Sequence, residues 1–124
     1  MSEFENDLLT EKIVACCFKI HRELGHGFSE KIYEMALQIL FGAEKILFER
    51  QREFVVFYDN RKVGMFRCDL VVNGKVILEL KSITGIMPVL FRNQLISYLR
   101  ASGVKTGLLI NFGNKSCDVK RVSV

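Results

Sequence analysis

Two segments place charged side chains inside otherwise apolar sequence. Glu79 and Lys81 lie two residues apart in the run 76–81, and Asp69 lies within the apolar run 68–72. Residues two apart on a strand share a face, so a carboxylate and an ammonium would lie side by side on a buried strand. Because a buried charge without a partner is costly, these groups should pair, reach solvent at a cleft, or hold a metal ion. The simpler alternative is a strand with one solvated face.

The hairpin between these two strands decides whether Asp69 can meet Glu79. A two-residue loop at Asn73-Gly74 would place Cys68 opposite Glu79 and turn Asp69 to the other face. A three-residue loop, residues 73–75 with a left-handed residue, would place Asp69 directly opposite Glu79, with Cβ atoms about 5 Å apart. We predict the second register.

Two carboxylates at this short distance repel one another, and an oxygen-preferring divalent cation such as Mg²⁺ or Mn²⁺ relieves that repulsion. Such a cation keeps positions free for water and phosphate, polarises a phosphoryl oxygen and lowers the pKa of bound water. Lys81 beside the carboxylates would neutralise charge and orient or deprotonate the attacking water. These residue types therefore indicate phosphodiester hydrolysis.

The surrounding pattern predicts the elements that hold these residues. Apolar residues at helical spacing predict one helix over 9–24, closed by Gly25, and a second over 29–43 with Ser29 as N-cap. β-branched and aromatic residues predict three consecutive antiparallel strands over 53–58, 62–72 and 75–83. A third helix should begin at Pro88 and end at Gly103. Strands over 106–112, expected to be central, and 118–124, expected at an edge, complete the chain.

The expected order is ααβββαββ, a mixed sheet flanked by helices in the α/β class. A length of 124 residues suits one domain, which we place at residues 1–124. Such an architecture alone names no function.

The charge pattern leaves two readings open. The net charge is +4, which permits a phosphate-bearing partner without requiring one. Several basic residues fall in one region and would line either a nucleic-acid face or a solvated strand surface: Arg50, Arg52, Arg61, Lys62 and Arg67.

Other features bear on location and on metal chemistry. No apolar run approaches the length of a membrane span, and the acidic N-terminal segment lacks the features of a signal peptide, so we expect a cytoplasmic protein with no membrane partner. The four cysteines lack CxxC spacing and are expected to be free buried thiols rather than zinc ligands: Cys16, Cys17, Cys68 and Cys117. His21 and His26 show no ligand spacing.

Two motifs together resemble a known family. Asp69, nine further residues and then Glu79-Leu80-Lys81 resemble the D…ExK signature of the PD-(D/E)XK nuclease superfamily. Residues 27–33, with Gly27, Glu30 and Tyr33, resemble the motif of the GxxExxY proteins within it. The resemblance covers nearly the whole chain, although Cys68 stands where the superfamily's nominal proline would precede the aspartate.

The resemblance implies a set of site residues. Asp69 and Glu79 would bind Mg²⁺ or Mn²⁺ with the Leu80 carbonyl, Lys81 would be the catalytic lysine, and Glu30 would add a carboxylate from the second helix. Gln94 would be a supporting polar residue on the third helix. Each of three residues also has a structural explanation. Glu30 would interact favourably with its helix dipole, Gln94 would lie at the boundary of the buried helix face, and Tyr33 would be a core aromatic with a tethered hydroxyl.

Three functions follow from these observations. The first is a metal-dependent nuclease acting on DNA or RNA. The second is a catalytically inactive module that keeps the fold and binds nucleic acid or a protein partner. The third is a homo-oligomer that associates through apolar helix faces. The complete set of acidic residues with the lysine favours the first.

Overall fold

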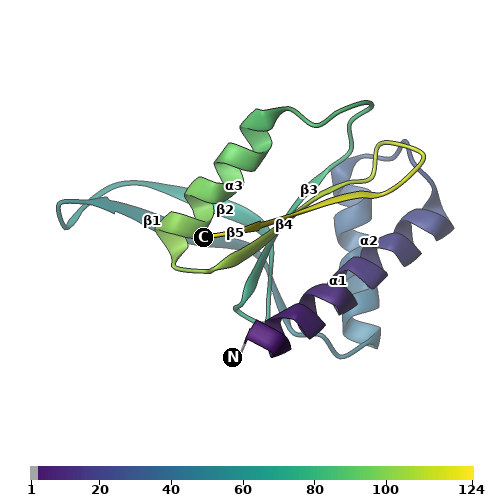
Figure 1. Ribbon diagram of the computed structural model, residues 1–124, viewed down its shortest axis with the longest axis horizontal. Coiled ribbons are helices and arrows are strands. Elements are labelled where there is room, and N and C mark those ends of the chain that lie inside the picture. The colour runs from purple at the N-terminus through teal and green to yellow at the C-terminus, as the bar shows by residue number, and fades with distance from the viewer. Residues whose placement is uncertain (1–2) are drawn as a thin grey trace.

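The computed structural model describes residues 3–124, which form three helices and one five-stranded sheet (Figure 1). The elements follow one another as α1 (Glu3–Leu24), α2 (Glu30–Ala43), β1 (Phe48–Tyr58), β2 (Arg61–Val72), β3 (Val76–Lys81), α3 (Val89–Ser102), β4 (Thr106–Asn111) and β5 (Asp118–Ser123). This order confirms the predicted α/β class and the sequence ααβββαββ. Within residues 3–124, no helix has the length and apolar character needed to cross a membrane.

Two predicted element boundaries were wrong by five or more residues, and the others, including the end of β3 at Lys81 rather than residue 83, differ by at most two. α1 begins at Glu3 rather than residue 9, because its polar first turns continue the helix and dock on the sheet, where Asn6 Nδ2 donates to Thr106 Oγ1 at 2.8 Å. β1 begins at Phe48 rather than residue 53, because its first residues pair with the end of β2, starting with Phe48 opposite Val72. The residues at positions 49–53 are all polar, four of them charged, so the sequence does not show the apolar pattern of a strand there.

The strands lie in the order β1-β2-β3-β4-β5. β1, β2 and β3 form the predicted antiparallel meander, and β4 returns through α3 to pair parallel with β3. β4 is buried along its whole length, and β5 pairs antiparallel with it at the edge. The expected central and edge positions of these last two strands are therefore confirmed.

The helices cover opposite faces of the sheet (Figure 1). α1 and α2 pack on one face, where Ile13, Tyr33 and Phe41 join residues of β2, β3 and β4 in a buried cluster. α3 packs on the other face, where Leu95 and Leu99 contact Ile77 and Leu109. A strand buried on both sides needs apolar residues on both faces, which explains the continuous apolar character of β3 and β4.

The turn between β2 and β3 confirms the predicted register. Val72 faces Val76, so residues 73–75 form a three-residue loop, and Lys75 N donates to Val72 O at 2.9 Å. Asn73 and Gly74 adopt left-handed conformations with φ of 52° and 64°, which glycine and asparagine tolerate best. The loop therefore brings residue 69 to the level of residue 79.

The β1–β2 hairpin extends beyond the rest of the sheet as an arm (Figure 1). At its tip Tyr58 faces Arg61, and Asp59 and Asn60 form the turn in left-handed conformations. The base of this arm is the part of β2 that carries Asp69.

Candidate functional site

Asp69 and Glu79 meet where β2 and β3 separate. The last backbone pair on this side is Leu70 with Leu78, and the next step of the register places Asp69 opposite Glu79. At this level, hydrogen bonds from backbone N–H groups to side-chain carboxylates take the place of backbone hydrogen bonds between the two strands. Glu79 Oε1 accepts a hydrogen bond from the Asp69 N–H at 3.2 Å, and Asp69 Oδ2 accepts one from the Leu80 N–H at 2.8 Å. Each carboxylate is thus held by the backbone of the neighbouring strand.

Both β2 and its neighbour β1 depart from regular strand geometry next to Asp69. Cys68 packs in the cluster beneath α3, whereas Leu70 packs in the cluster beneath α1 and α2, although residues two apart on a regular strand share a face. On β1, Arg50 pairs with Leu70 and Arg52 with Cys68, while the intervening Gln51 has φ of 51°. The side chains of β2 therefore stop alternating regularly between the two faces of the sheet at Asp69. This departure lets the Asp69 carboxylate reach β3.

Burial and mutual repulsion shift the protonation of this pair. Burial, followed by the Asp69 carboxylate, raises the pKa of Glu79 from 4.5 to about 8, against the opposing effects of the Asp69 N–H and Lys81. Burial also raises the pKa of Asp69, while its hydrogen bond from Leu80 and the charge of Lys81 lower it. Near neutral pH the protonated form of Glu79 is therefore favoured, and full ionisation of both carboxyl groups requires a compensating cation.

Lys81 lies on the α3 side of the same strand. Its Nζ is 4.2 Å from the centroid of the Phe91 ring, which begins the buried side of α3. The Lys81 charge lowers the pKa of both Asp69 and Glu79, but among residues 6–124 it forms no ion pair within 4.0 Å. The lysine is near the carboxylates while its ammonium group rests on an aromatic face.

A cleft of about 390 Å³ opens beside Asp69 and Leu80, on the side of α2. Glu30, at the start of α2, lines this cleft, and its charge contributes to the raised pKa of Glu79. Three cations share the lining: Lys31, Arg50 and Arg67. Glu34 also lines the cleft and accepts a hydrogen bond from Gln51 Nε2 at 2.9 Å. The cleft thus places three basic side chains beside Asp69, where they could contact an anionic ligand.

Gln94 lies outside the carboxylate pair. It is exposed on α3, four residues before Tyr98, and it lowers the pKa of the Tyr98 hydroxyl. The Tyr98 ring stacks on Phe66 with centroids 4.2 Å apart, and burial followed by the charge of Glu79 raises the Tyr98 pKa. Gln94 therefore reaches the site only through Tyr98, a residue to which the sequence interpretation gave no separate role.

Tyr33 is a buried aromatic residue with a tethered hydroxyl, as the structural alternative held. Its hydroxyl donates to Gly25 O at 2.6 Å and accepts from the Phe28 N–H at 3.3 Å. Its ring stacks on Phe112 with centroids 4.4 Å apart. Ser82 Oγ in turn donates to Phe28 O at 2.5 Å. These contacts fix the loop before α2, and with it the position of Glu30.

Two residues that the sequence interpretation missed anchor the end of β3. The buried Asn111 side chain accepts from the N–H groups of Ile83 and Gly113 and donates to Ile83 O, all at 3.0 Å. Gly113 lies so close to this segment that an added Cβ would be 2.2 Å from Ile83 O. A buried asparagine within an apolar strand was the available signal, because such a group needs hydrogen-bond partners.

The donor set at this point fits a hard divalent cation. The Asp69 and Glu79 carboxylates and the Leu80 carbonyl are oxygen donors of the kind that Mg²⁺ and Mn²⁺ prefer, with further positions left for water and substrate. Within the described part of the chain, no three side chains of His, Cys, Asp or Glu gather closely enough to hold a metal ion. The structure therefore brings two of the three expected carboxylates together, and Glu30 faces the adjoining cleft.

Comparisons with known proteins agree with this fold. A family model described as the PD-(D/E)XK nuclease superfamily matches residues 7–122. Among solved structures, the crystal structure of SSO0001 is similar, with a TM-score of 0.60 at 17% sequence identity over 75% of this chain and 48% of that one. The chain thus spans about half the length of that protein, and the likeness concerns the fold. No curated protein matches the sequence.

Proposed function

Because the chain belongs to the PD-(D/E)XK nuclease superfamily, whose members are generally dependent on divalent metals, we propose that it is a metal-dependent nuclease that hydrolyses phosphodiester bonds in DNA or RNA. One observation carries the proposal. Asp69 and Glu79 converge from neighbouring strands and are held there by backbone N–H groups, although burial raises the pKa of both carboxyls. Two ionised carboxylates held this close repel one another, and a bound divalent cation would offset that repulsion.

In this proposal Asp69, Glu79 and the Leu80 carbonyl hold Mg²⁺ or Mn²⁺, and Glu30 supplies a further carboxylate through the cleft. When bound, the cation would polarise the phosphoryl oxygen and lower the pKa of a water ligand. The protein contributes by fixing the carboxylates before the ion arrives, so little reorganisation is needed on binding.

Lys81 acts as the catalytic lysine in the proposal. Its ammonium group orients the attacking water and neutralises negative charge on the phosphate, which requires it to turn from Phe91 toward the carboxylates. Gln94 positions Tyr98 beside Glu79 and so acts one residue removed from the chemistry. In the residues that resemble the GxxExxY motif, Glu30 would act at the cleft, and Tyr33 would hold the loop that positions Glu30.

Basic residues of the cleft would bind the phosphates that flank the scissile bond. Lys31, Arg50 and Arg67 line the same cleft as Asp69, and Arg67 is held by an ion pair with Glu53 at 2.9 Å. Sequence-independent contacts of this kind position a nucleic-acid backbone without reading its bases. We propose that residues 1–124 perform this function as a single domain in the cytoplasm.

A cleavage assay with matched variants tests the proposal. Purified protein is incubated with plasmid, single-stranded DNA and RNA in Mg²⁺, Mn²⁺ or EDTA, beside Asp69→Asn, Lys81→Met and the exposed control Glu11→Gln. We expect metal-dependent cleavage that each site variant slows about 100-fold or more and that the control leaves unchanged. Cleavage that persists in both site variants comes from a contaminant and contradicts the proposal.

The inactive-module alternative gives a different result in the same samples. If the wild type binds nucleic acid in a fluorescence anisotropy titration but cleaves none, and calorimetry detects no Mn²⁺ binding, the acidic pair is a remnant. The proposed nuclease instead predicts Mn²⁺ binding that Asp69→Asn weakens.

A further inference from the structure

A second cavity lies at the end of the sheet opposite the carboxylate pair. It has a volume of about 620 Å³, between β1, the β2–β3 turn, the loop from α3 to β4, and β5. Lys75 and Lys105 line it and immediately precede the parallel strands β3 and β4, so both lie at the same end of the sheet. Lys75 is four residues before Glu79, about 13 Å away along the strand. This cavity is therefore distinct from the cleft beside Asp69.

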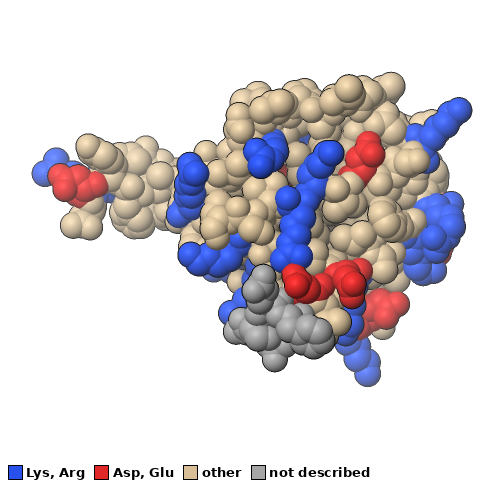
Figure 2. Space-filling model, in the orientation of Figure 1, with Lys and Arg blue, Asp and Glu red and all other residues tan. Residues whose placement is uncertain are grey.

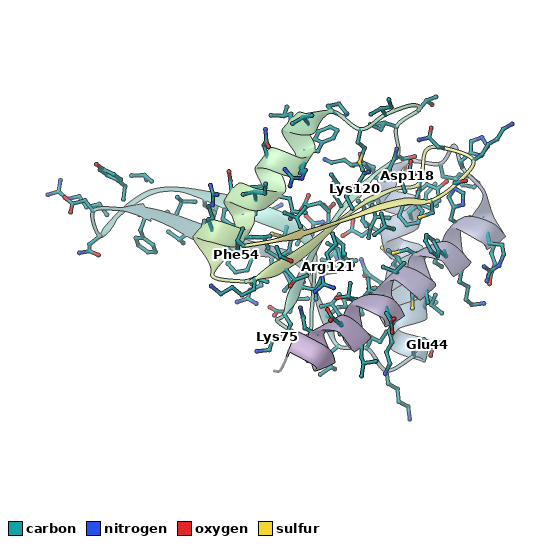
Figure 3. The ribbon with its side chains drawn as sticks, viewed as in Figure 1. Glu44, Phe54, Lys75, Asp118, Lys120 and Arg121 are labelled. Atoms are coloured by element: carbon teal, nitrogen blue, oxygen red, sulfur yellow. The ribbon has the colours of Figure 1, made fainter. Side chains whose placement is uncertain are left out.

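The cavity lining is strongly basic. Among residues 6–124, four lining side chains are cationic and none is acidic: Arg52, Lys75, Lys105 and Arg121. Figure 3 shows Lys75 and Arg121 approaching the same end of the sheet, near the start of α1, and Figure 2 shows basic side chains gathered on this face. Cations that share one concave surface raise the local positive potential and attract anions.

Ion pairs around the cavity leave much of this charge uncompensated. Arg52 Nη1 is 3.1 Å from Glu49 Oε1, and Arg121 Nη1 is 2.7 Å from Asp7 Oδ1, which holds both guanidinium groups in place. A guanidinium has five N–H donors, so each keeps donors for a ligand. Lys75 and Lys105 form no ion pair with any side chain among residues 6–124.

Two further features of the wall suit a ligand that is more than a bare anion. The Phe54 ring lies in the lining, covered by the Arg52 guanidinium 4.6 Å from its centroid and stacked on Phe66 at 5.3 Å, so it adds apolar surface to the wall beside the charges. Asn6 also lines the cavity and donates to Thr106 Oγ1, and its buried Oδ1 has no hydrogen-bond partner among residues 6–124. The volume lies within the range of small-molecule sites.

We propose that this cavity binds the phosphate group of a nucleotide. Several lysine and arginine donors that line one cavity match the oxygens of a phosphate better than the single charge of a carboxylate. The nucleoside would lie toward Phe54 and Asn6. The inference goes beyond the proposed nuclease activity and does not depend on it, because the proposed phosphate contacts come from cationic side chains and need no metal.

Binding without metal tests the inference separately from catalysis. AMP, inorganic phosphate and adenosine are titrated by calorimetry in EDTA into the Asp69→Asn protein, which is expected to be unable to cleave. The double variant Lys75→Ala/Lys105→Ala is compared with Lys12→Ala/Lys115→Ala, which removes two exposed lysines elsewhere, and thermal melts check that both are folded. AMP should bind, phosphate should compete with it, and adenosine should not bind. The cavity variant should weaken AMP binding tenfold or more and the control less than twofold.

Three results would overturn the inference. The first is AMP binding that is equal in the two double variants. The second is adenosine binding as tightly as AMP, since the phosphate would then not determine affinity. The third is no binding of AMP or phosphate at about 10 mM, a concentration at which even a weak specific site is filled. Loss of nuclease activity in the cleavage assay would leave all of these outcomes unaffected.

Discussion

Replacing Glu79 by Gln is expected to stabilise the metal-free protein at alkaline pH. The Glu79 side chain is almost completely buried, and its pKa is raised from 4.5 to about 8, first by burial and then by Asp69. Gln has nearly the same shape and keeps an oxygen that can accept the Asp69 N–H. The substitution therefore removes the buried charge with little change in packing.

The sign and size of the effect follow from the raised pKa. A carboxyl whose pKa is higher in the folded than in the unfolded state favours folding below the unfolded value of 4.5, and this contribution is lost as the pH rises toward about 8. A tenfold change in the acid dissociation constant corresponds to about 1.4 kcal/mol, so Glu79 should lower the free energy of unfolding by roughly 3 to 5 kcal/mol between pH 4 and pH 8.5. Gln does not titrate, so the variant should escape this loss.

Urea unfolding in EDTA at a series of pH values measures the difference directly. The stability of Glu79→Gln minus that of the wild type should be small at pH 4 and rise by those roughly 3 to 5 kcal/mol by pH 8.5. Glu11→Gln, at an exposed position of α1, should show no such trend. A difference that stays constant with pH would refute the reasoning, because Glu79 would then be no more costly to ionise in the folded state.

Three other substitutions test separate parts of the structure. Gly113→Ala should destabilise the protein by more than about 3 kcal/mol in urea unfolding, since its Cβ would overlap the Ile83 carbonyl, whereas Gly42→Ala in open space on α2 should be neutral or stabilising; equal effects would contradict the close packing. Tyr33→Phe should cost about 1 to 3 kcal/mol by removing two hydrogen bonds while keeping the ring, and unchanged stability would show that the hydroxyl does not fix the loop. Arg67→Ala should weaken nucleic-acid binding and reduce its salt dependence by about one counterion, as measured by fluorescence anisotropy at several salt concentrations. An unchanged dependence of affinity on salt would show that Arg67 does not contact the nucleic acid.

The pairing of Asp69 with Glu79 could be predicted because it depends on a local rule. Asn73 and Gly74 accept left-handed conformations, a three-residue loop fixes the register, and the register brings the two carboxylates to one level. The helices and the buried strands could be predicted for a similar reason, since their apolar patterns repeat over many residues.

The parts that escaped prediction depend on contacts between distant segments. Gln51 looks like any polar strand residue, yet its left-handed conformation interrupts the β1–β2 ladder beside Asp69. Asn111 binds Ile83, which is 28 residues away, and no local pattern indicates that partner. The position of Lys81 over Phe91 likewise depends on how α3 docks on the sheet. Such features require the assembled fold.

The central claim is that Asp69 and Glu79 together bind a divalent cation, and a crystal structure of the protein soaked with Mn²⁺ tests it most directly. An anomalous difference map should show one strong peak between the two carboxylates, at about 2.2 Å from their oxygens and near the Leu80 carbonyl. A map with no peak there at saturating Mn²⁺, or with the ion bound at other residues, would contradict the account.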